Sequence, residues 1–268
     1  FIQDCAMKCS TSMPAVGLSC LLLGAIIVLP ATAAPALPAK AVTSQLTPYA
    51  ARFGRTRPVV AVIGENSGTE VTDFLIPYGV LKQSNAADVF AVSTQSGPLT
   101  LRPALTIESD ATVTTFDQRF PDGADYVIVP AVNKIADPTL TAWISTQAAK
   151  GATIVSICDG ALVVANTGLM NGHKATAHWA TKAYRRKHYP KVLWQRNVRY
   201  VVDGKIVSSA GISASMPVSL ALVEAIAGHD VADAEAKALG VTDWSTQHNS
   251  EAFEPRLGVN LFPLIAVC

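Results

Sequence analysis

One cysteine stands where a residue could act as a nucleophile. In the stretch VSICDGALVVANTGLM, residues 155–170, Cys158 ends an apolar, β-branched run and is followed by small residues. A cysteine between a strand and a helix, with Gly160 two positions later, has the pattern of a nucleophile elbow. The N-terminus of that helix would favour the thiolate and could donate N–H groups to a developing oxyanion. A lone cysteine is also a common core filler, so the rest of the sequence has to decide.

Acidic and imidazole side chains that could assist a thiol occur in two other segments. Glu70 and Asp73 lie in GTEVTDFLIP (68–77), directly after an apolar run, and His178 lies in ATAHW (175–179). A carboxyl at the start of a helix ordinarily caps it, and a lone histidine ordinarily packs or faces solvent. Spacing alone therefore leaves both interpretations open.

The elements that must position these residues alternate between apolar strands and helices. Gly151 and Gly228 have the pattern of helix C-caps, and Pro77 predicts a kink or an early end of its helix. Alternating strands and helices predict βαβ crossovers and a mainly parallel sheet with helices on both faces. Sites in such sheets form at the carboxyl ends of the strands, where Cys158 falls. Strands are expected at 58–64, 87–94, 124–130 and 152–157, hairpins at 97–107 and 198–211, and helices at 71–83, 138–151, 213–228 and 230–240.

The composition is that of a globular protein with no dominant charge. Of the 268 residues, 50% are hydrophobic and 15% are charged, which is enough to fill a core and argues against disorder. The formal net charge of +1 gives no overall field toward nucleic acid. A basic run remains, and we interpret it as a solvated helix face rather than a phosphate-binding patch. Its members are Lys182, Arg185, Arg186, Lys187 and His188.

The N-terminal part has the pattern of a targeting segment. If translation starts at Met7, then a positive residue, an apolar run at 15–29 and a small-residue cleavage motif follow in order. We therefore expect residues 1–34 to be a signal peptide or a membrane anchor, with cleavage favoured over a tether through residues 15–34. The domain would then be exported, periplasmic or membrane-anchored outside the cytoplasm. Residues 35–57, rich in Pro, Ala and Thr, are predicted to be a linker.

The cysteines do not form a disulfide framework or a metal site. Three of the five, at positions 5, 9 and 20, lie in the N-terminal segment, which leaves Cys158 and Cys268. A bridge between those two stays open in an oxidising compartment, and no CxxC spacing indicates a metal. The domain is expected over 58–240, followed by a tail at 241–268. That tail ends in the apolar stretch NLFPLIAVC, which suggests truncation.

Three segments together resemble one family. IGENSGTEVTDFLIPYGVL, SICDGALVVANTGLMNGHKATAHW and DGKIVSSAGISASMPVSLALVEAIAG are similar to the ThiJ/PfpI superfamily, within the class I glutamine amidotransferase-like fold. The resemblance spans about residues 57–240. It is strongest to a branch that contains isonitrile hydratase and the sensor domains of AraC/GlxA-type transcription regulators. It implies a flavodoxin-like α/β fold, no organic or metal cofactor, and a homodimer.

The resemblance also implies roles for individual residues. Cys158 matches the elbow cysteine, and Asp73 matches an acidic residue that leans toward its sulfur, with Glu70 as the second choice because it lies nearer the loop. His178 matches a histidine placed near the cysteine in many members. Asp159, through its backbone N–H, and Gly160 match the wall of the elbow.

Two departures from the family pattern bear on function. Asp159 follows the cysteine where the hydratase-like members carry threonine, and this argues against isonitrile hydration. A second carboxylate beside the sulfur would also oppose thiolate formation, unless it points away as the helix cap. Only 28 residues follow Gly240, too few for the helix-turn-helix domain of the regulators, so no direct nucleic-acid binding is expected of this chain.

Two functions from different classes therefore stay open. The first is a cysteine-dependent enzyme of hydrolase, hydratase or glyoxalase-like type, acting on a small molecule through Cys158, Asp73 and His178. The second is a non-catalytic domain that senses a ligand or oxidation at the same cysteine. The sequence does not identify the substrate or ligand.

Overall fold

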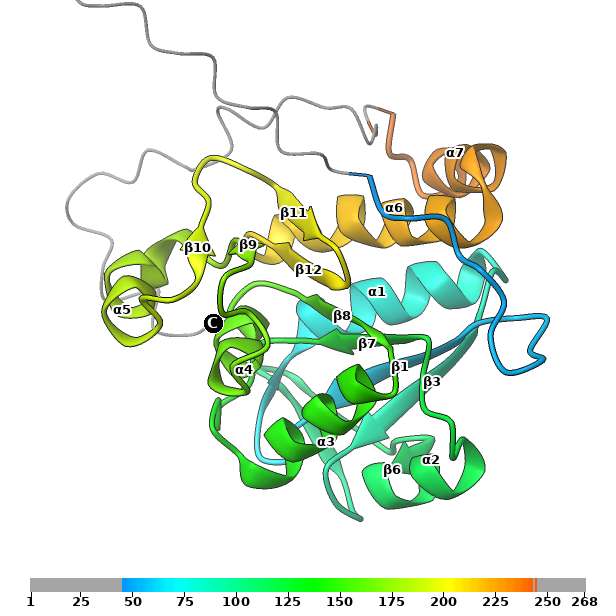
Figure 1. Cartoon of the computed structure of the whole chain (residues 1–268). Helices are drawn as coiled ribbons and strands as arrows, with labels where there is room; N and C mark the ends of the chain where they lie inside the picture. The colour runs from blue at the N-terminus through cyan, green and yellow to red at the C-terminus, as the bar shows by residue number, and fades with distance from the viewer. Residues whose placement is uncertain (1–44, 243, 245–268) are drawn as a thin grey trace, which may run out of the picture. The chain divides into compact units, whose positions relative to one another are not determined.

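A seven-stranded sheet forms the centre of the domain. The computed structural model describes residues 45–242 and 244, and its main sheet has the strand order β11-β12-β8-β7-β1-β3-β6 (Figure 1). All neighbouring pairs are parallel except the hairpin β11–β12. The strands are β1 (Val59–Gly64), β3 (Asp88–Ser93), β6 (Ala111–Thr112), β7 (Tyr126–Val129), β8 (Thr153–Ser156), β11 (Tyr200–Asp203) and β12 (Ile206–Ser209).

Helices cover both faces of this sheet, as predicted. Alternate residues of β1 show why: Val60 and Val62 pack in one core cluster, whereas Ala61 and Ile63 pack in the other. The first cluster includes residues of α1 (Val71–Gln83), α6 (Ser215–Ala227) and α7 (His229–Ala238). The second includes residues of α2 (Val113–Arg119), α3 (Pro138–Ala149) and α4 (Gly160–Asn166), on the opposite face in Figure 1.

Shorter elements lie around the sheet. A three-stranded sheet joins β2 (Thr69–Glu70), β4 (Leu99–Arg102) and β5 (Leu105–Ile107), which contains the hairpin predicted at 97–107. A two-stranded sheet joins β9 (Lys174–Ala175) and β10 (Leu193–Trp194). Between them in sequence lie the 3₁₀ turn η1 (Trp179–Thr181) and α5 (Lys182–His188), and η2 (Ile212–Ala214) precedes α6.

The helix predicted at 71–83 is confirmed as α1. Of the two effects expected of Pro77, a kink or an early end, the early end is absent, because α1 continues for six residues beyond it to Gln83. The hairpin predicted at 198–211 is present as β11 and β12, and Gly204 takes a φ of 63° in its turn.

Part of the predicted linker is fastened to the domain. Residues 45–57 have no helix or strand, yet the N–H of Tyr49 donates to the carbonyl of Ala225 at 2.7 Å. Arg52 donates to the carbonyls of Lys150 and Gly151, at 2.5 and 2.6 Å. Residues 1–44, and with them the predicted leader, lie outside the described residues, as do 243 and 245–268 of the tail. Within the described part of the chain, no helix is long and apolar enough to cross a membrane.

Candidate functional site

Cys158 lies in a sharp turn between β8 and α4. Its side chain is fully buried, and its backbone has a φ of 55°, in the left-handed region that a cysteine rarely adopts. The turn closes through the N–H of Gly160, which donates to the carbonyl of Ile157 at 2.8 Å. The strand–cysteine–helix turn predicted from the sequence is therefore present, with a strained residue at its apex.

Position 160 requires glycine because another backbone segment approaches it closely, not because of its own dihedral angles. A Cβ at this position would overlap the carbonyl oxygen of Val129 and come within 2.8 Å of its carbonyl carbon. Because these are backbone atoms at the end of β7, they cannot move aside cheaply. The first turn of α4 can thus lie against β7 only with glycine here, and this packing holds the elbow in place.

Asp73 and Glu70 play different parts at the start of α1. Glu70 is the N-cap, and its Oε2 accepts from the N–H of Asp73 at 2.6 Å and the hydroxyl of Thr72 at 2.7 Å. The carboxyl of Asp73 is fully buried, and its Oδ2 accepts from the N–H of Ala131 at 3.2 Å. Of the two carboxyls considered, Glu70 therefore caps the helix and Asp73 points to the end of β7.

The segment after β7 connects Asp73 with the elbow. Val129 and Pro130 lie against Gly160 on one side, and Ala131 binds Asp73 on the other. Cys158, Ala131 and Phe74, the neighbour of Asp73 on α1, also belong to one buried cluster. Asp73 and the elbow thus meet the same few residues at the carboxyl end of the sheet.

Asp159 does not cap α4 with its side chain. It stands at the N-cap position, but no cap hydrogen bond is made, and its Oδ1 accepts instead from the hydroxyl of Thr181 at 2.8 Å. The sequence left open whether this carboxylate points away as the cap of α4, and the structure shows no such cap bond. The carboxylate does point away from α4, toward the turn that carries His178.

His178 is fixed at both its ring and its backbone. The ring Nδ1 accepts from the N–H of Ala180 at 3.2 Å, so the neutral ring carries its proton on Nε2. The carbonyl accepts from the Nη1 of Arg185, and the hydroxyl oxygen of Thr181 lies 2.9 Å from it. Trp179 packs beside the ring, with 4.1 Å between the ring centroids.

Arg185 is a correction to the interpretation of the basic run. The run does form α5, and three of its members are exposed, but Arg185 is only 1% exposed and faces inward. Its guanidinium donates to the carbonyls of Ala177 and His178 and lies 5.3 Å from the ring centroid of Trp194. The solvated-face interpretation is therefore wrong for this residue, which instead holds the His178 turn.

The residues that the sequence reasoning missed are Thr181 and Arg185. Thr181 joins Asp159 to His178, so the elbow and the histidine segment are connected through one hydroxyl. The available signal was the spacing, since Thr181 and Arg185 follow His178 by three and seven residues on consecutive short helices. Nothing in residue type alone distinguished Arg185 from its exposed neighbours.

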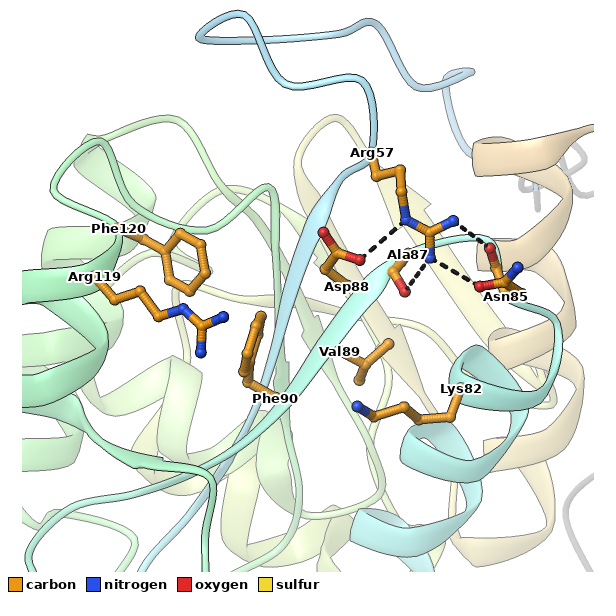
Figure 2. Close-up of a pocket in the computed structure, with 9 residues that line it drawn as sticks. All are labelled: Arg57, Lys82, Asn85, Ala87, Asp88, Val89, Phe90, Arg119 and Phe120. Atoms are coloured by element: carbon orange, nitrogen blue, oxygen red, sulfur yellow. Dashed lines mark hydrogen bonds and ion pairs between the residues drawn. The ribbon is translucent and has the colours of Figure 1, made fainter.

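A groove at the other end of the sheet is separate from these residues. It measures about 410 Å³ and lies beside the beginning of β3 (Figure 2). Arg57 lines one side of it, bound to Asp88 at 3.0 Å and to the carbonyls of Asn85 and Ala87 at 2.8 and 3.0 Å. Among the described residues, no cluster of three His, Cys, Asp or Glu side chains could hold a metal ion.

The match to known proteins covers the same region as this fold. Residues 59–225, more than half of the chain, match the DJ-1/PfpI family. The chain belongs to this family. Among solved structures, Drosophila melanogaster DJ-1beta superposes with a TM-score of 0.63 at 21% identity, covering 70% of this chain and 100% of that one. An AraC family transcriptional regulator from Pseudomonas putida gives 0.58 at 16% identity, covering 68% and 98%. At these identities the superpositions show the fold.

Two curated relatives of this DJ-1/PfpI domain have different described roles. Isonitrile hydratase from Pseudomonas putida is 29% identical over 169 residues, which is 60% of this chain and 68% of that protein. The HTH-type transcriptional regulator CdhR from Pseudomonas aeruginosa is 25% identical over 173 residues. That match covers 62% of this chain but only 50% of CdhR, so the chain spans about half the length of that regulator.

Proposed function

We propose that this DJ-1/PfpI domain performs cysteine-dependent chemistry on a small electrophilic molecule, with Cys158 as the nucleophile. The observation that carries the proposal is the backbone of Cys158, which keeps a φ of 55° in a fully buried turn. Such strain persists only where the surroundings impose it, and here the contact of Gly160 with Val129 does so. A cysteine that served only as a core filler would not need this conformation.

In the proposed step, the Cys158 thiolate adds to an electrophilic carbon, such as that of a carbonyl group. A sulfur–carbon bond forms while the π electron pair moves to the oxygen, which then takes a proton. Asp73 would take or share the thiol proton and return it to the oxygen, and the Nε2–H of His178 would assist by donating a hydrogen bond to that oxygen. The backbone N–H of Asp159, at the start of α4, would stabilise the oxyanion. The reaction type is hydrolase, hydratase or glyoxalase-like, without a cofactor.

The proposal does not extend to isonitrile hydration. One relative is an isonitrile hydratase, but Asp159 occupies the position after the cysteine where the resemblance implies threonine. A buried carboxylate bound to Thr181 cannot act as a threonine hydroxyl would. Carbonyl electrophiles are therefore the better first substrates.

A second candidate is a ligand- or redox-sensing domain without turnover. It is supported by the relatives, because one curated relative and one structural neighbour are transcription regulators. In this function the buried Cys158 would register a bound metabolite or its own oxidation. An exported or tethered position, through residues 15–34, and a homodimer stay sequence predictions for either function.

The test is the pH dependence of iodoacetamide alkylation of the full chain. Cys5, Cys9, Cys20 and Cys268 are replaced by Ser so that only Cys158 reacts, and Cys158→Ser in that background is the blank. We expect half-maximal alkylation well below pH about 8.5, the ordinary value for a cysteine thiol. Asp73→Asn should shift this midpoint without unfolding the domain.

A panel of aldehydes and dicarbonyls then separates the two candidate functions. A low midpoint with turnover that Cys158→Ser abolishes supports the enzyme. A low midpoint with saturable binding and no turnover supports the sensor. An ordinary midpoint, or no alkylation of the folded protein, contradicts the nucleophile.

A further inference from the structure

The hydroxyl of Thr181 lies between two acceptors, and it has one proton to donate. Its Oγ1 is 2.8 Å from Oδ1 of Asp159 and 2.9 Å from the carbonyl oxygen of His178. Both distances suit a hydrogen bond, so the other donors at each acceptor decide where the proton goes.

The carbonyl of His178 already accepts hydrogen bonds from two other donors. Nη1 of Arg185 donates to it, and so does the backbone N–H of Thr181, at 3.2 Å. A carbonyl oxygen has two lone pairs, and these two N–H donors occupy both. The proton of the Thr181 hydroxyl is therefore directed to the carboxylate of Asp159.

This bond fixes the direction of the carboxylate next to the reactive sulfur. Asp159 directly follows Cys158 and is 6% exposed, and a carboxylate that approached the thiol would oppose its ionisation. The alternative position, as a cap on the N–H groups of α4, is not used. The hydroxyl of Thr181, on the neighbouring turn, thus holds Oδ1 of Asp159 on its own side.

We propose that Thr181 is a positioning residue for the reactive thiol, acting by holding the Asp159 carboxylate away from Cys158. The inference rests on the proposed function, in which Cys158 reacts as a thiolate. Arg185 contributes to the same positioning of the Asp159 carboxylate. By occupying the His178 carbonyl, it leaves the Thr181 proton for Asp159.

Other titratable groups also lie at this end of the domain. They lie on several elements and are left unchanged in the experiment, so a shift caused by Thr181 can be assigned to Asp159. These groups are Glu70 and Asp73 at the start of α1, His178 before η1, Arg185 on α5 and Tyr200 on β11.

The experiment compares alkylation midpoints of Cys158 in the single-cysteine full chain. Thr181→Val keeps the shape but removes the hydroxyl, and we expect the midpoint to rise by about half a pH unit to one unit as the carboxylate is released. Alkylation at pH 7 should slow by about three- to tenfold. Thr181→Ser, which keeps the hydroxyl, should restore the midpoint. Thr181→Ala is the second variant if Thr181→Val does not fold.

A double-mutant cycle with Asp159→Asn isolates the interaction. Without the carboxylate there is no charge to hold, so Thr181→Val should leave the midpoint of Asp159→Asn unchanged. An equal shift in both backgrounds would mean that Thr181 acts only on the local structure and would overturn the inference. A lowered midpoint in the parent that Thr181→Val does not alter would also overturn it, while leaving the proposed function intact. An ordinary midpoint in the parent removes the proposed function itself.

Discussion

The two ends of the main sheet use buried polar groups in opposite ways. At the amino end, Asp125 is almost fully buried and binds Arg55 at 3.0 Å and the N–H of Val59 at 2.8 Å. Arg57 is bound to Asp88 at 3.0 Å in a more exposed pair at the same end. At the carboxyl end, the carboxyls of Asp73 and Asp159 accept from a backbone amide and a hydroxyl.

The difference separates two roles of buried carboxyls: holding a chain segment in place, and influencing the ionisation of a neighbouring thiol. Carboxylates that face arginines fix the segment 45–57 to the domain, and their charge is compensated. The carboxyls of Asp73 and Asp159 each accept from a neutral donor, and both lie near a thiol in a strained turn, whose ionisation a nearby carboxylate influences. Four substitutions test this contrast, and the largest effect is expected where backbone packing holds the strain.

Gly160→Ala should be the most damaging. The added Cβ would overlap the carbonyl of Val129, so we expect a loss of about 3 kcal/mol in the free energy of unfolding. Gly79→Ala is the matched control, because Gly79 lies within α1 and a Cβ there meets nothing within 4 Å. That variant should gain up to about 1 kcal/mol. Urea unfolding of both measures the contrast, and equal effects would show that the elbow is not constrained by β7.

Arg185→Gln should be the next most damaging, and it should also affect the thiol. It removes a buried guanidinium from two carbonyls and from the ring of Trp194, at a cost of about 2 kcal/mol. Arg119→Gln is the control at the amino end, because Arg119 is exposed and should cost less than about 0.5 kcal/mol. Only Arg185→Gln should slow alkylation of Cys158. If Arg119→Gln slows it equally, the two ends are not independent.

Much of the fold could be predicted from sequence, because buried parallel strands are uninterrupted apolar runs and their connections are amphipathic or capped. The elbow was predictable for the same reason, since its position follows from β8 and α4. The roles of Thr181 and Arg185 were not, because their partners lie on other elements and a basic run does not reveal which member faces inward. The direction of the Asp159 side chain was not predictable for a similar reason: the sequence shows its N-cap position, but a hydroxyl 22 residues away binds its carboxylate.

The amino end should show its own dependence on pH. Burial, together with the nearby carboxylate of Asp125, raises the pKa of Tyr126 to about 12 from the ordinary 10.0. Because the folded state holds this proton more tightly than the unfolded chain, stability is full below pH 10 and falls as pH rises toward 12. Tyr126→Phe should remove about 1 kcal/mol of that loss at pH 11. Thermal unfolding of both proteins at pH 7 and pH 11 measures it, and an identical pH dependence would contradict the assignment.

The smallest effect is expected in the groove of Figure 2. Arg57→Ala removes the ion pair with Asp88 and the bonds to the carbonyls of Asn85 and Ala87. The ion pair is substantially exposed, with 39% and 52% of the two side chains accessible, so water replaces it at little cost. We expect a loss below about 1 kcal/mol and no change in the alkylation midpoint of Cys158. A shifted midpoint would mean that charge at the amino end reaches the thiol through the sheet. The two roles would then not be separate, because charges at both ends of the sheet would change the alkylation midpoint of Cys158.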